Sequence, residues 1–534
     1  MTVLSDSTVV SSRSRLELAV EPGERWWGGA IEDGAAMPFG QTPFERNLGV
    51  PESIDNSLAG RPSNQSAPLL LSTAGRFVWS EHPFEFSFQA GLLQVTGHEL
   101  QMFETGGTLR DAFLAASDRF FPASGSAPAR EMFSSPQYNT WIEQPYLPTQ
   151  QSVLTYARAL LDSGQKPGVL IIDDSWATGY GTWSFDEGRF PQPRQMVDQL
   201  HDWGFRVMLW LVPFISADSA AFRHLEREGM LVCGSNGQTA LRRWWNGVSA
   251  LLDVSNPAAV TWLTDQLDAL VREVGIDGFK FDGGDVRDFY PDDITLQASD
   301  PVEKTQAWAA IGLRYPFNEF RACWRMGGQP LAQRLQDKRP VWGPEGIGSL
   351  VPEMLAQGMI GHAFTCPDMI GGGEIDAMTG QATIDQEFFV RYAQIAALSP
   401  MAQFSVNPSR VLDPTHLGAV EQAFALRDKL LPEILLLVEH AARTGEPIIR
   451  PMAYHQAGTE HLNDQYFLGP DLFVAPITEK GAAQRTVFVP EGRWEQDRTG
   501  VVFEGPAIFT IEVDLATIPL FSRESRALAP SGAH

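Results

Sequence analysis

The sequence predicts an α/β protein in which a parallel (β/α)8 TIM-type barrel stands between two smaller β-sandwiches. The chain has 534 residues, and a barrel takes up about 250, which leaves room for other modules. Short apolar runs separated by helical stretches fill the middle of the chain, as in parallel strands with crossover helices. Short alternating runs with glycine and proline fill both ends. We expect domains at 1–125, 126–445 and 446–534.

The first domain is predicted from alternating runs such as 77–80 and 84–89, which are typical of antiparallel strands in a sandwich. Its segment Arg25-Trp-Trp-Gly-Gly29 places two aromatic residues before a glycine pair. Core filling with a turn is the favoured interpretation, because large aromatic residues are mostly buried. The alternative is a loop that leans over a neighbouring pocket. The small, proline-containing stretch 126–136 is typical of a domain junction.

The barrel is predicted from strand-like runs at 169–172, 205–213 and 359–364, with helices at 195–203 and 261–274. Acidic residues follow several of these runs. Because the active site of a parallel barrel lies at the carboxyl ends of its strands, this placement favours one shared pocket. A doubly wound sheet would also gather residues there, but neither GxxxxGK[ST] nor GxGxxG follows a strand. The C-terminal sandwich is predicted from runs at 484–489 and 507–513.

The stretch 275–285 is the strongest candidate for a functional strand end. Alternation directs Phe279 and Phe281 to one face and Lys280 and Asp282 to the other. A buried carboxylate must be paired, hydrated or used, and Lys280 would help keep Asp282 ionised. The glycines at 283–284 allow a tight turn beside a ligand. The alternative is an ordinary surface ion pair at a strand end.

Composition restricts the partners. With 40 basic and 65 acidic side chains the net charge is −25, which disfavours nucleic acid and anionic membranes and suits a neutral small molecule. The cysteines at 233, 323 and 366 form no CxxC pair, and the histidines form no HxH or HExxH group, so we expect no metal and no cofactor. The polar start and the lack of a long apolar run predict a cytoplasmic protein. The sequence leaves homo-oligomerisation open.

Several motifs together resemble glycoside hydrolase family 31, in particular its α-galactosidase branch, and they occur in the family's order. The resemblance covers most of the chain. The matching segments are Ile171-Ile-Asp-Asp-Ser-Trp176, Arg243-Trp-Trp-Asn-Gly247, Phe279-Lys-Phe-Asp-Gly-Gly-Asp285, Asp337-Lys-Arg-Pro-Val-Trp342, Pro367-Asp-Met-Ile-Gly-Gly372 and Tyr466-Phe-Leu-Gly-Pro-Asp-Leu-Phe-Val-Ala-Pro476.

The resemblance implies retaining hydrolysis of an α-glycoside by two carboxylates, which would lie about 5–5.5 Å apart. The position that matches the nucleophile is Asp282. The acid/base falls on Asp337, from its spacing to Trp342. A drier setting for Asp337 would keep its pKa above that of Asp282. Taken alone, Asp337 lies in a charged stretch and would be a solvated loop aspartate.

The resemblance also implies residues that bind the sugar. Acids that match hydroxyl-binding positions, and tryptophans as flat platforms, are the expected lining. Each tryptophan has core packing as its alternative, and Asp368 has a helix cap. Asp285 departs from the glutamate found in many members. The candidates are Asp173, Asp174, Trp176, Trp210, Trp244, Lys280, Arg325 and Asp368.

Other functions remain open at this stage. An α-glucosidase or a transglycosylase would use the same two carboxylates, so the motifs do not separate them from an α-galactosidase. A non-catalytic carbohydrate-binding protein would keep the tryptophans and lose one carboxylate. A metal-dependent hydrolase is disfavoured by the histidine pattern. The second, distal sandwich of many relatives is expected to be absent.

Overall fold

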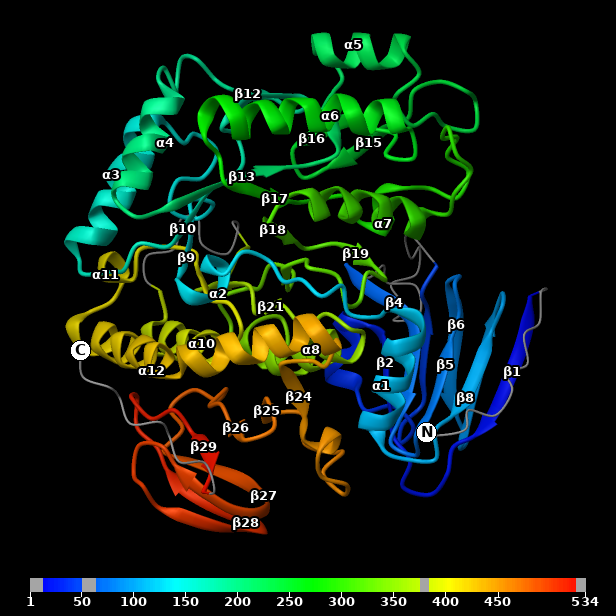
Figure 1. Ribbon diagram of the computed structural model, residues 1–534, viewed down its shortest axis with the longest axis vertical. Coiled ribbons are helices and arrows are strands. Elements are labelled where there is room, and N and C mark those ends of the chain that lie inside the picture. Colours follow the sequence, from blue (N-terminus) through cyan, green and yellow to red (C-terminus); the bar gives the residue numbers. More distant parts are fainter. Residues whose placement is uncertain (1–12, 50–63, 375–383, 525–534) are drawn as a thin grey trace.

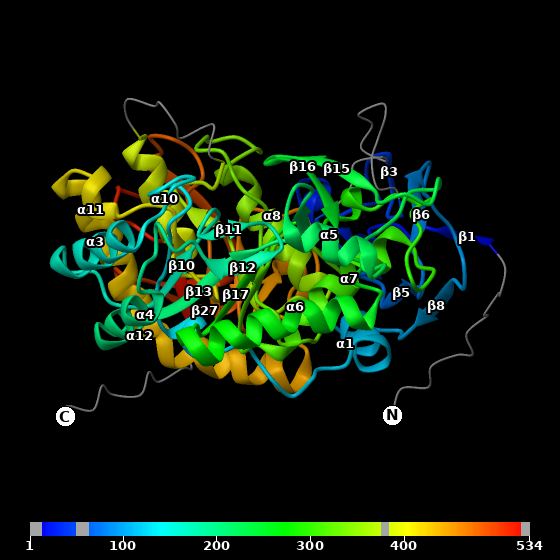
Figure 2. The same ribbon diagram turned by 90° about the horizontal axis from the view of Figure 1, so that it is seen from above.

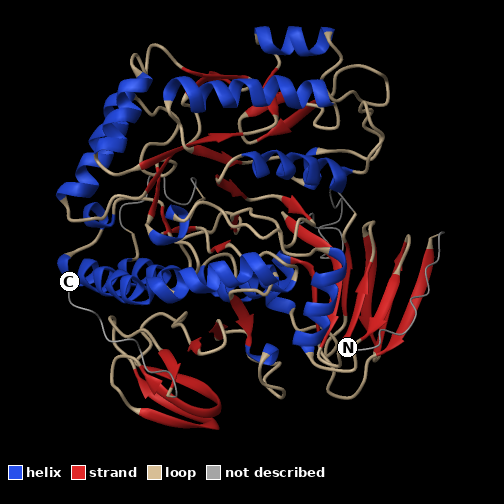
Figure 3. Cartoon of the chain, viewed as in Figure 1, coloured by secondary structure: helices blue, strands red, loops and turns tan. Residues whose placement is uncertain are grey.

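The computed structural model describes residues 13–49, 64–374 and 384–524. Three parts follow one another along the chain (Figure 1): two antiparallel sheets, a parallel barrel surrounded by helices, and a smaller antiparallel domain. Figure 3 shows the strands of the first and last parts at the periphery, with the long helices between them. This confirms the predicted fold class. We propose 1–125, 126–445 and 446–534 as the domain boundaries.

Two facing sheets form the N-terminal part, and their strands alternate as predicted. In β6 the buried side chains are Phe84, Phe86 and Phe88, while the residues between them face outward. Trp26 and Trp27 lie in β2 and are buried, so core filling is confirmed and the pocket loop is wrong. One sheet has the order β1-β7-β6-β3 (Ser14–Ala19, Leu92–Gly97, Phe84–Gln89, Phe44–Asn47), and the other contains β2 (Trp26–Ala30), β4 (Gln65–Ser72), β5 (Arg76–Trp79) and β8 (Gln101–Glu104). The helix α1 (Leu109–Phe120) follows.

The barrel is one parallel sheet whose two ends meet. Within the described residues its order is β21-β20-β18-β17-β13-β10-β9-β23-β22. Only Pro367 and Asp368 separate β21 from β22, so the ring closes through one interrupted strand. Asp368 has a φ of 68°, which bends the chain at this interruption. The bounds are β9 Gln137–Asn139, β10 Val169–Ile172, β13 Arg206–Leu211, β17 Gly278–Phe281, β18 Phe317–Phe320, β20 Gln333–Arg334, β21 Thr365–Cys366, β22 Met369–Ile370 and β23 Gln403–Phe404.

Helices follow most of the strands and cover the outside of the ring, as Figure 2 shows for α3, α4 and α6. The predicted helices correspond to α4 and to α6, which a π-helical turn extends to Val274. The strand expected at 359–364 is wrong, because α8 runs to Met359 and a turn then leads into the short β21. The helices are α3 Gln150–Asp162, α4 Pro193–Asp202, α6 Pro257–Ala269, α7 Pro301–Ile311, α8 Ile347–Met359, α10 Gln386–Ala397 and α12 Pro414–Thr444.

The connection between β18 and β20 joins the barrel to the N-terminal sheets. Residues 321–332, all described, contain no helix; instead β19 (Cys323–Trp324) pairs in parallel with the start of β4. The side chain of Gln65 donates hydrogen bonds to the carbonyls of Arg321 (3.1 Å) and Arg334 (2.7 Å). The N-terminal part is therefore fastened to the barrel where β18 ends.

The C-terminal part is a six-stranded antiparallel sheet that follows α12. A separate apolar core forms around Phe467, Phe473, Trp494 and Phe521. The strand predicted at 484–489 lies within β27, and the strand predicted at 507–513 lies within β28 except for Val513, so both are confirmed. Across the described ranges no helix has the length and apolar character needed to cross a membrane. The order is β24 (Ile449–Pro451), β25 (Tyr466–Leu468), β26 (Leu472–Val474), β29 (Leu520–Arg523), β27 (Gln484–Gln496) and β28 (Val502–Glu512).

Candidate active site

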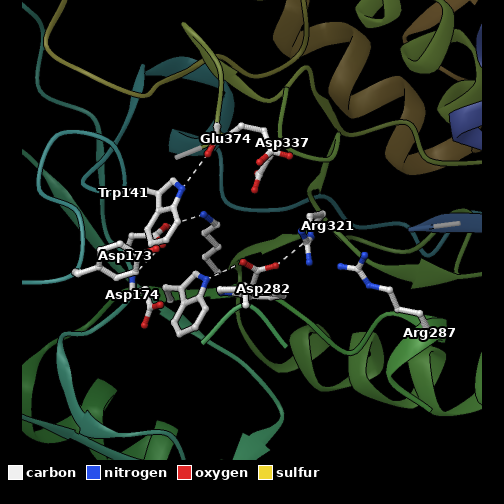
Figure 4. A pocket seen from close by; sticks show the side chains of 13 residues that line it. Trp141, Asp173, Asp174, Asp282, Arg287, Arg321, Asp337 and Glu374 are labelled. Carbon is white, nitrogen blue, oxygen red and sulfur yellow. Dashed lines mark hydrogen bonds and ion pairs between the residues drawn. The ribbon is translucent and has the colours of Figure 1, made fainter. Parts of the chain in front are cut away.

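A cavity of about 220 Å³ opens at the carboxyl ends of the barrel strands (Figure 4). Five neighbouring strands supply its polar side chains from their ends, as the sequence predicts for a shared pocket. Figure 4 shows Asp282 and Asp337 directed into the cavity from different sides. The lining residues are Trp141, Tyr146, Asp173, Asp174, Trp210, Trp245, Lys280, Asp282, Arg287, Arg321, Asp337, Gly373 and Glu374.

Asp282 is held by two donors and one cation. Trp210 Nε1 donates to Oδ2 and the backbone N–H of Gly283 donates to Oδ1, both at 2.8 Å. Arg321 Nε lies 3.1 Å from Oδ1. Gly283 and the next glycine are both left-handed, as the predicted tight turn requires. Burial favours the neutral acid, but Arg321, Lys280 and Arg334 outweigh it and hold the pKa of Asp282 well below its usual range.

Arg321 is itself fixed from behind. Its Nη2 lies 3.0 Å from Asp285 Oδ2, and the other oxygen of Asp285 accepts a hydrogen bond from Asn64 Nδ2. Burial lowers the pKa of the Arg321 guanidinium, but the charges of Asp282, Asp285 and Asp337 outweigh it and raise that pKa. Asp285 therefore connects a residue just before β4 to the cation that pairs with Asp282.

Lys280 and Asp173 form a buried ion pair on the floor of the cavity. Lys280 Nζ lies 2.6 Å from Asp173 Oδ2, and both side chains are 4% exposed. The surface ion pair offered as an alternative is therefore wrong, although Lys280 does help to keep Asp282 ionised. Asp174 contacts neutral donors, Tyr180 Oη at 3.0 Å and Asn246 Nδ2. Burial and the charge of Asp173 raise the pKa of Asp174 to about 6.

Asp337 follows β20 and is more open than Asp282. Its side chain is 25% exposed, and Arg334 Nη1 lies 2.8 Å from Oδ1. Burial raises the pKa, but Arg334 and Arg321 outweigh it and leave the pKa of Asp337 below its usual value. The expected drier setting with a raised pKa is therefore wrong, because the side chain is partly exposed and two cations face this carboxylate.

Asp368 lies behind the cavity and does not line it. It is fully buried, pairs with Arg334, and accepts a hydrogen bond of 2.8 Å from the N–H of Lys338. Arg334 also pairs with Glu319 at 3.0 Å. Burial raises the pKa of Asp368 to about 7 even though Arg334 opposes this. The expected direct grip on a sugar hydroxyl is wrong here, and so is the helix cap, since Asp368 interrupts a strand.

Only one of the three predicted tryptophans lines the cavity. Trp210 does so, whereas Trp176 is buried against Phe185, with its Nε1 donating to the carbonyl of Trp210 at 2.7 Å. Trp244 stacks on Phe214 with the ring centroids 4.2 Å apart. Core packing therefore explains Trp176 and Trp244.

The predicted Arg325 pairs with Glu81 of the N-terminal part and stands outside the lining. Arg321, four residues earlier, takes the position beside the carboxylates. The end of β18 at Phe320 is the signal that would have found it, since the ends of β10 and β17 likewise carry Asp173 and Asp282.

The lining residues divide into a floor and a rim, and the sequence did not predict all of them. The floor residues Asp173, Trp210 and Asp282 are at most 8% exposed. Tyr146 and Trp245 at the mouth are 45% and 42% exposed. Trp245 lies within the quoted segment 243–247, so the motif contained it. The other residues that sequence reasoning missed are Trp141, Arg287, Arg321, Gly373 and Glu374.

A parallel barrel with carboxylates, arginines and tryptophans around a cavity at its strand ends is an arrangement typical of glycoside hydrolases. Residues 131–342 match the TIM-barrel domain model of glycosyl hydrolase family 31, and residues 445–528 match its C-terminal domain model. The chain belongs to glycosyl hydrolase family 31.

Relatives and solved structures agree with this assignment. The chain is 32% identical to the myogenesis-regulating glycosidase of Mus musculus, over 76% of this chain and 58% of that protein. It is 23% identical to a sulfoquinovosidase of Escherichia coli K12, over 80% of this chain and 66% of the relative. A sulfoquinovosidase from E. rectale, solved with an aza-sugar inhibitor, superposes with a TM-score of 0.82 at 18% identity. The superposition covers 96% of this chain and 83% of that structure's chain. The chain thus spans 58% and 66% of the length of these two curated relatives.

Proposed function

We propose that this protein is a retaining α-glycosidase that removes terminal α-galactosyl residues. The observation that carries the proposal is that Asp282 and Asp337 enter one cavity from different strand ends, with Asp282 ionised and fixed. Two carboxylates beside one sugar are what retaining hydrolysis requires.

In the first step, an oxygen of Asp282 attacks the anomeric carbon and forms a glycosyl ester. The bond to the leaving oxygen breaks, and Asp337 supplies that oxygen with a proton. In the second step, Asp337 takes a proton from water, which displaces Asp282 and restores both groups. The contacts from Trp210 and Gly283 keep the Asp282 oxygens in place throughout.

Asp337 must carry a proton for the first step, although its pKa is lowered in the free site. A bound sugar removes water from the exposed quarter of this side chain, and desolvation raises the pKa of a carboxyl group. The charge of Asp282 also raises the pKa of Asp337. Forming the ester removes that charge, so the pKa of Asp337 falls again when it must act as a base.

The sugar preference rests on the floor of the cavity and on the motif resemblance. An axial 4-hydroxyl needs a polar partner on the opposite side of the ring from that of glucose. Lys280, Asp173 and Asp174 supply polar groups on this floor. A site that hydrogen-bonds one epimer can reject the other by orders of magnitude. An α-glucosidase, or a transglycosylase in which a sugar hydroxyl replaces water, is the alternative within the same mechanism.

A panel of 4-nitrophenyl α-glycosides tests the proposal. We expect the highest kcat/KM with the α-galactoside, and release of the α-anomer as the first product by NMR. A higher kcat/KM for the α-glucoside would overturn the sugar assignment and leave the mechanism standing. No hydrolysis of any α-glycoside, or a β-anomer as first product, would overturn the mechanism itself.

A further inference from the structure

Lys338, the residue after Asp337, is buried and paired with Glu353. Its side chain is 3% exposed, and the Glu353 carboxylate on α8 is 6% exposed. Neither side chain lines the cavity. The mechanism above uses neither of them, so a buried lysine and a buried glutamate remain to be explained.

The backbone of Lys338 is held as firmly as its side chain. Its N–H donates to Asp368 Oδ2 at 2.8 Å, in the interrupted strand of the barrel. Its carbonyl accepts a hydrogen bond of 3.0 Å from the N–H of Gly373, which lines the cavity. Three contacts, one from α8 and two from the stretch 368–373, therefore fix Lys338, while the adjacent Asp337 reaches the open cavity. Any movement of Lys338 would redirect Asp337.

The N-terminal sheets support this pair from the other side of α8. Gly34, in a short 3-10 helix at Ile31–Ala36, packs so closely on α8 that a Cβ there would lie 2.5 Å from the Pro352 carbonyl oxygen. Beside it, Asp33 and Arg46 form a second buried ion pair, with Arg46 Nε 2.6 Å from Asp33 Oδ2. The position of α8, and with it Glu353, is thus set by the N-terminal part.

A buried ion pair adds little net stability compared with apolar side chains of the same size. Breaking one by removing a partner leaves an uncompensated charge and is strongly unfavourable. Such a pair therefore fixes geometry more than it stabilises the fold. At this position the geometry that it fixes is that of the segment carrying Asp337.

We propose that Lys338 and Glu353 are positioning residues for the acid–base chemistry of Asp337, and that the N-terminal sheets take part by holding α8 against the barrel. The proposal rests on the proposed α-glycosidase activity. It assigns the N-terminal part a role in protonating the leaving group, in addition to any role in stability.

The first test compares leaving groups. Glu353→Gln and Lys338→Met are assayed with the 4-nitrophenyl glycoside that the panel selects and with a disaccharide of the same sugar. We expect kcat/KM to fall at least about tenfold more for the disaccharide, because only its leaving group needs a proton. Lys338→Arg, which keeps the charge, should recover most of the loss. Equal losses on both substrates would overturn the proposal.

Glu24→Gln is the matched control, since Glu24 and Arg76 form a buried ion pair within the N-terminal part and outside the cavity. It should lower the melting temperature without changing the ratio between the two substrates. A change in that ratio as large as that of Glu353→Gln would also overturn the proposal. If Glu353→Gln does not fold, Glu353→Asp is measured in the same way.

A second readout does not depend on activity. Amide hydrogen exchange over 335–340 should become at least about tenfold faster in Glu353→Gln than in the wild type, with 278–283 unchanged. Unchanged exchange at 335–340 would overturn the positioning role even if no glycoside were hydrolysed. Absence of hydrolysis by the wild type would instead count against the proposed function.

Discussion

The two sides of the cavity hold their carboxylates in different ways. Asp282, at the end of β17, receives two hydrogen bonds and one ion pair and is almost fully buried. Asp337, after β20, is 25% exposed and pairs with Arg334, a cation that also serves Glu319 and Asp368. One side is fixed by direct contacts to the carboxylate. On the other side, one ion pair reaches the carboxylate, and the remaining contacts fix the neighbouring Lys338.

This difference matches what each role demands. A nucleophile keeps its charge until the bond forms, so fixed donors and a nearby guanidinium serve it throughout. An acid/base must gain and lose a proton, and several strong partners on its oxygens would oppose that change. A fixed backbone with an open side chain can satisfy both needs. Substitutions at five positions test this difference.

The largest effect is expected for Asp282→Asn, which should lower kcat for 4-nitrophenyl α-galactoside by at least about 10⁴-fold, because no glycosyl ester forms. The matched control is Asp277→Asn, at the opposite end of the same strand, where the partners are His201 at 2.8 Å and the Val207 N–H at 2.7 Å. It should retain activity per folded molecule. Near wild-type activity in Asp282→Asn, after mass spectrometry has excluded deamidation, would contradict the assignment.

Asp337→Ala should have the next largest effect, and it should depend on the leaving group. General acid catalysis contributes about 10²–10⁴-fold when a poor leaving group must be protonated. We therefore expect that loss with a disaccharide and a much smaller loss with a 2,4-dinitrophenyl glycoside. Steady-state kinetics on the two substrates measure it. Equal losses would remove Asp337 from the acid role, and the contrast with Asp282 would lose its meaning.

Asp285→Asn tests the indirect support of Asp282, which Asp285 provides by holding Arg321. A hydrogen bond to a charged group contributes about 1.5–3 kcal/mol, so weakening the support of Arg321 should lower kcat/KM by about 10–150-fold. Asp293→Asn is the control, because Asp293 pairs with the buried Arg242 outside the cavity. Both variants are compared by kcat/KM and by urea unfolding. A loss of activity in Asp285→Asn no greater than in Asp293→Asn would count against this role.

The sequence predicts the fixed side of the site better than the open side. Alternation along one strand is a local signal, and it correctly directs Lys280 and Asp282 toward the cavity. Asp337 lies in a loop with no periodicity, so only the family resemblance identifies it as a candidate catalytic residue. The partners of Lys280 and Asp282 come from other strands, which no local pattern reveals.

The errors have one physical cause, which is tertiary packing. Trp176 and Trp244 lie in segments that match the family, but Phe185 and Phe214 cover them. Arg325 follows β19, which pairs with β4 outside the barrel, so its side chain pairs with Glu81 and does not reach the cavity. Asp368 lies in a segment that matches the family and is still buried beside Arg334, outside the cavity. The overall fold was easier to predict, because it depends on patterns repeated over many segments.

Asp174 extends the comparison to a carboxylate whose hydrogen-bond donors are neutral. Its pKa in the folded protein is about 6, above the ordinary 3.8, so folding disfavours the ionised form. The wild type should lose stability relative to Asp174→Asn as the pH rises from about 4 to above 6, by an amount on the order of 2–3 kcal/mol. Urea unfolding at pH 4, 5, 6 and 7.5 measures the difference. Asp368 also has a raised pKa, but both proteins contain it, so its contribution cancels in the difference between their stabilities. A difference independent of pH would contradict the prediction.

The smallest effect is expected at the rim, where Trp245 and Trp244 are neighbours in the chain. Trp245 is 42% exposed and its ring lies 5.3 Å from the Arg321 guanidinium, a contact of about 0.5–1 kcal/mol at an exposed site. Trp245→Ala should therefore lower kcat/KM only about two- to fivefold and leave the melting temperature unchanged. Trp244→Ala should do the reverse and destabilise the fold by about 3–5 kcal/mol, because this ring is packed on Phe214. Thermal unfolding and kinetics on both variants separate the two outcomes. If Trp245→Ala instead cost a hundredfold in activity, the open side would be as tightly organised as the nucleophile side, and the comparison would fail.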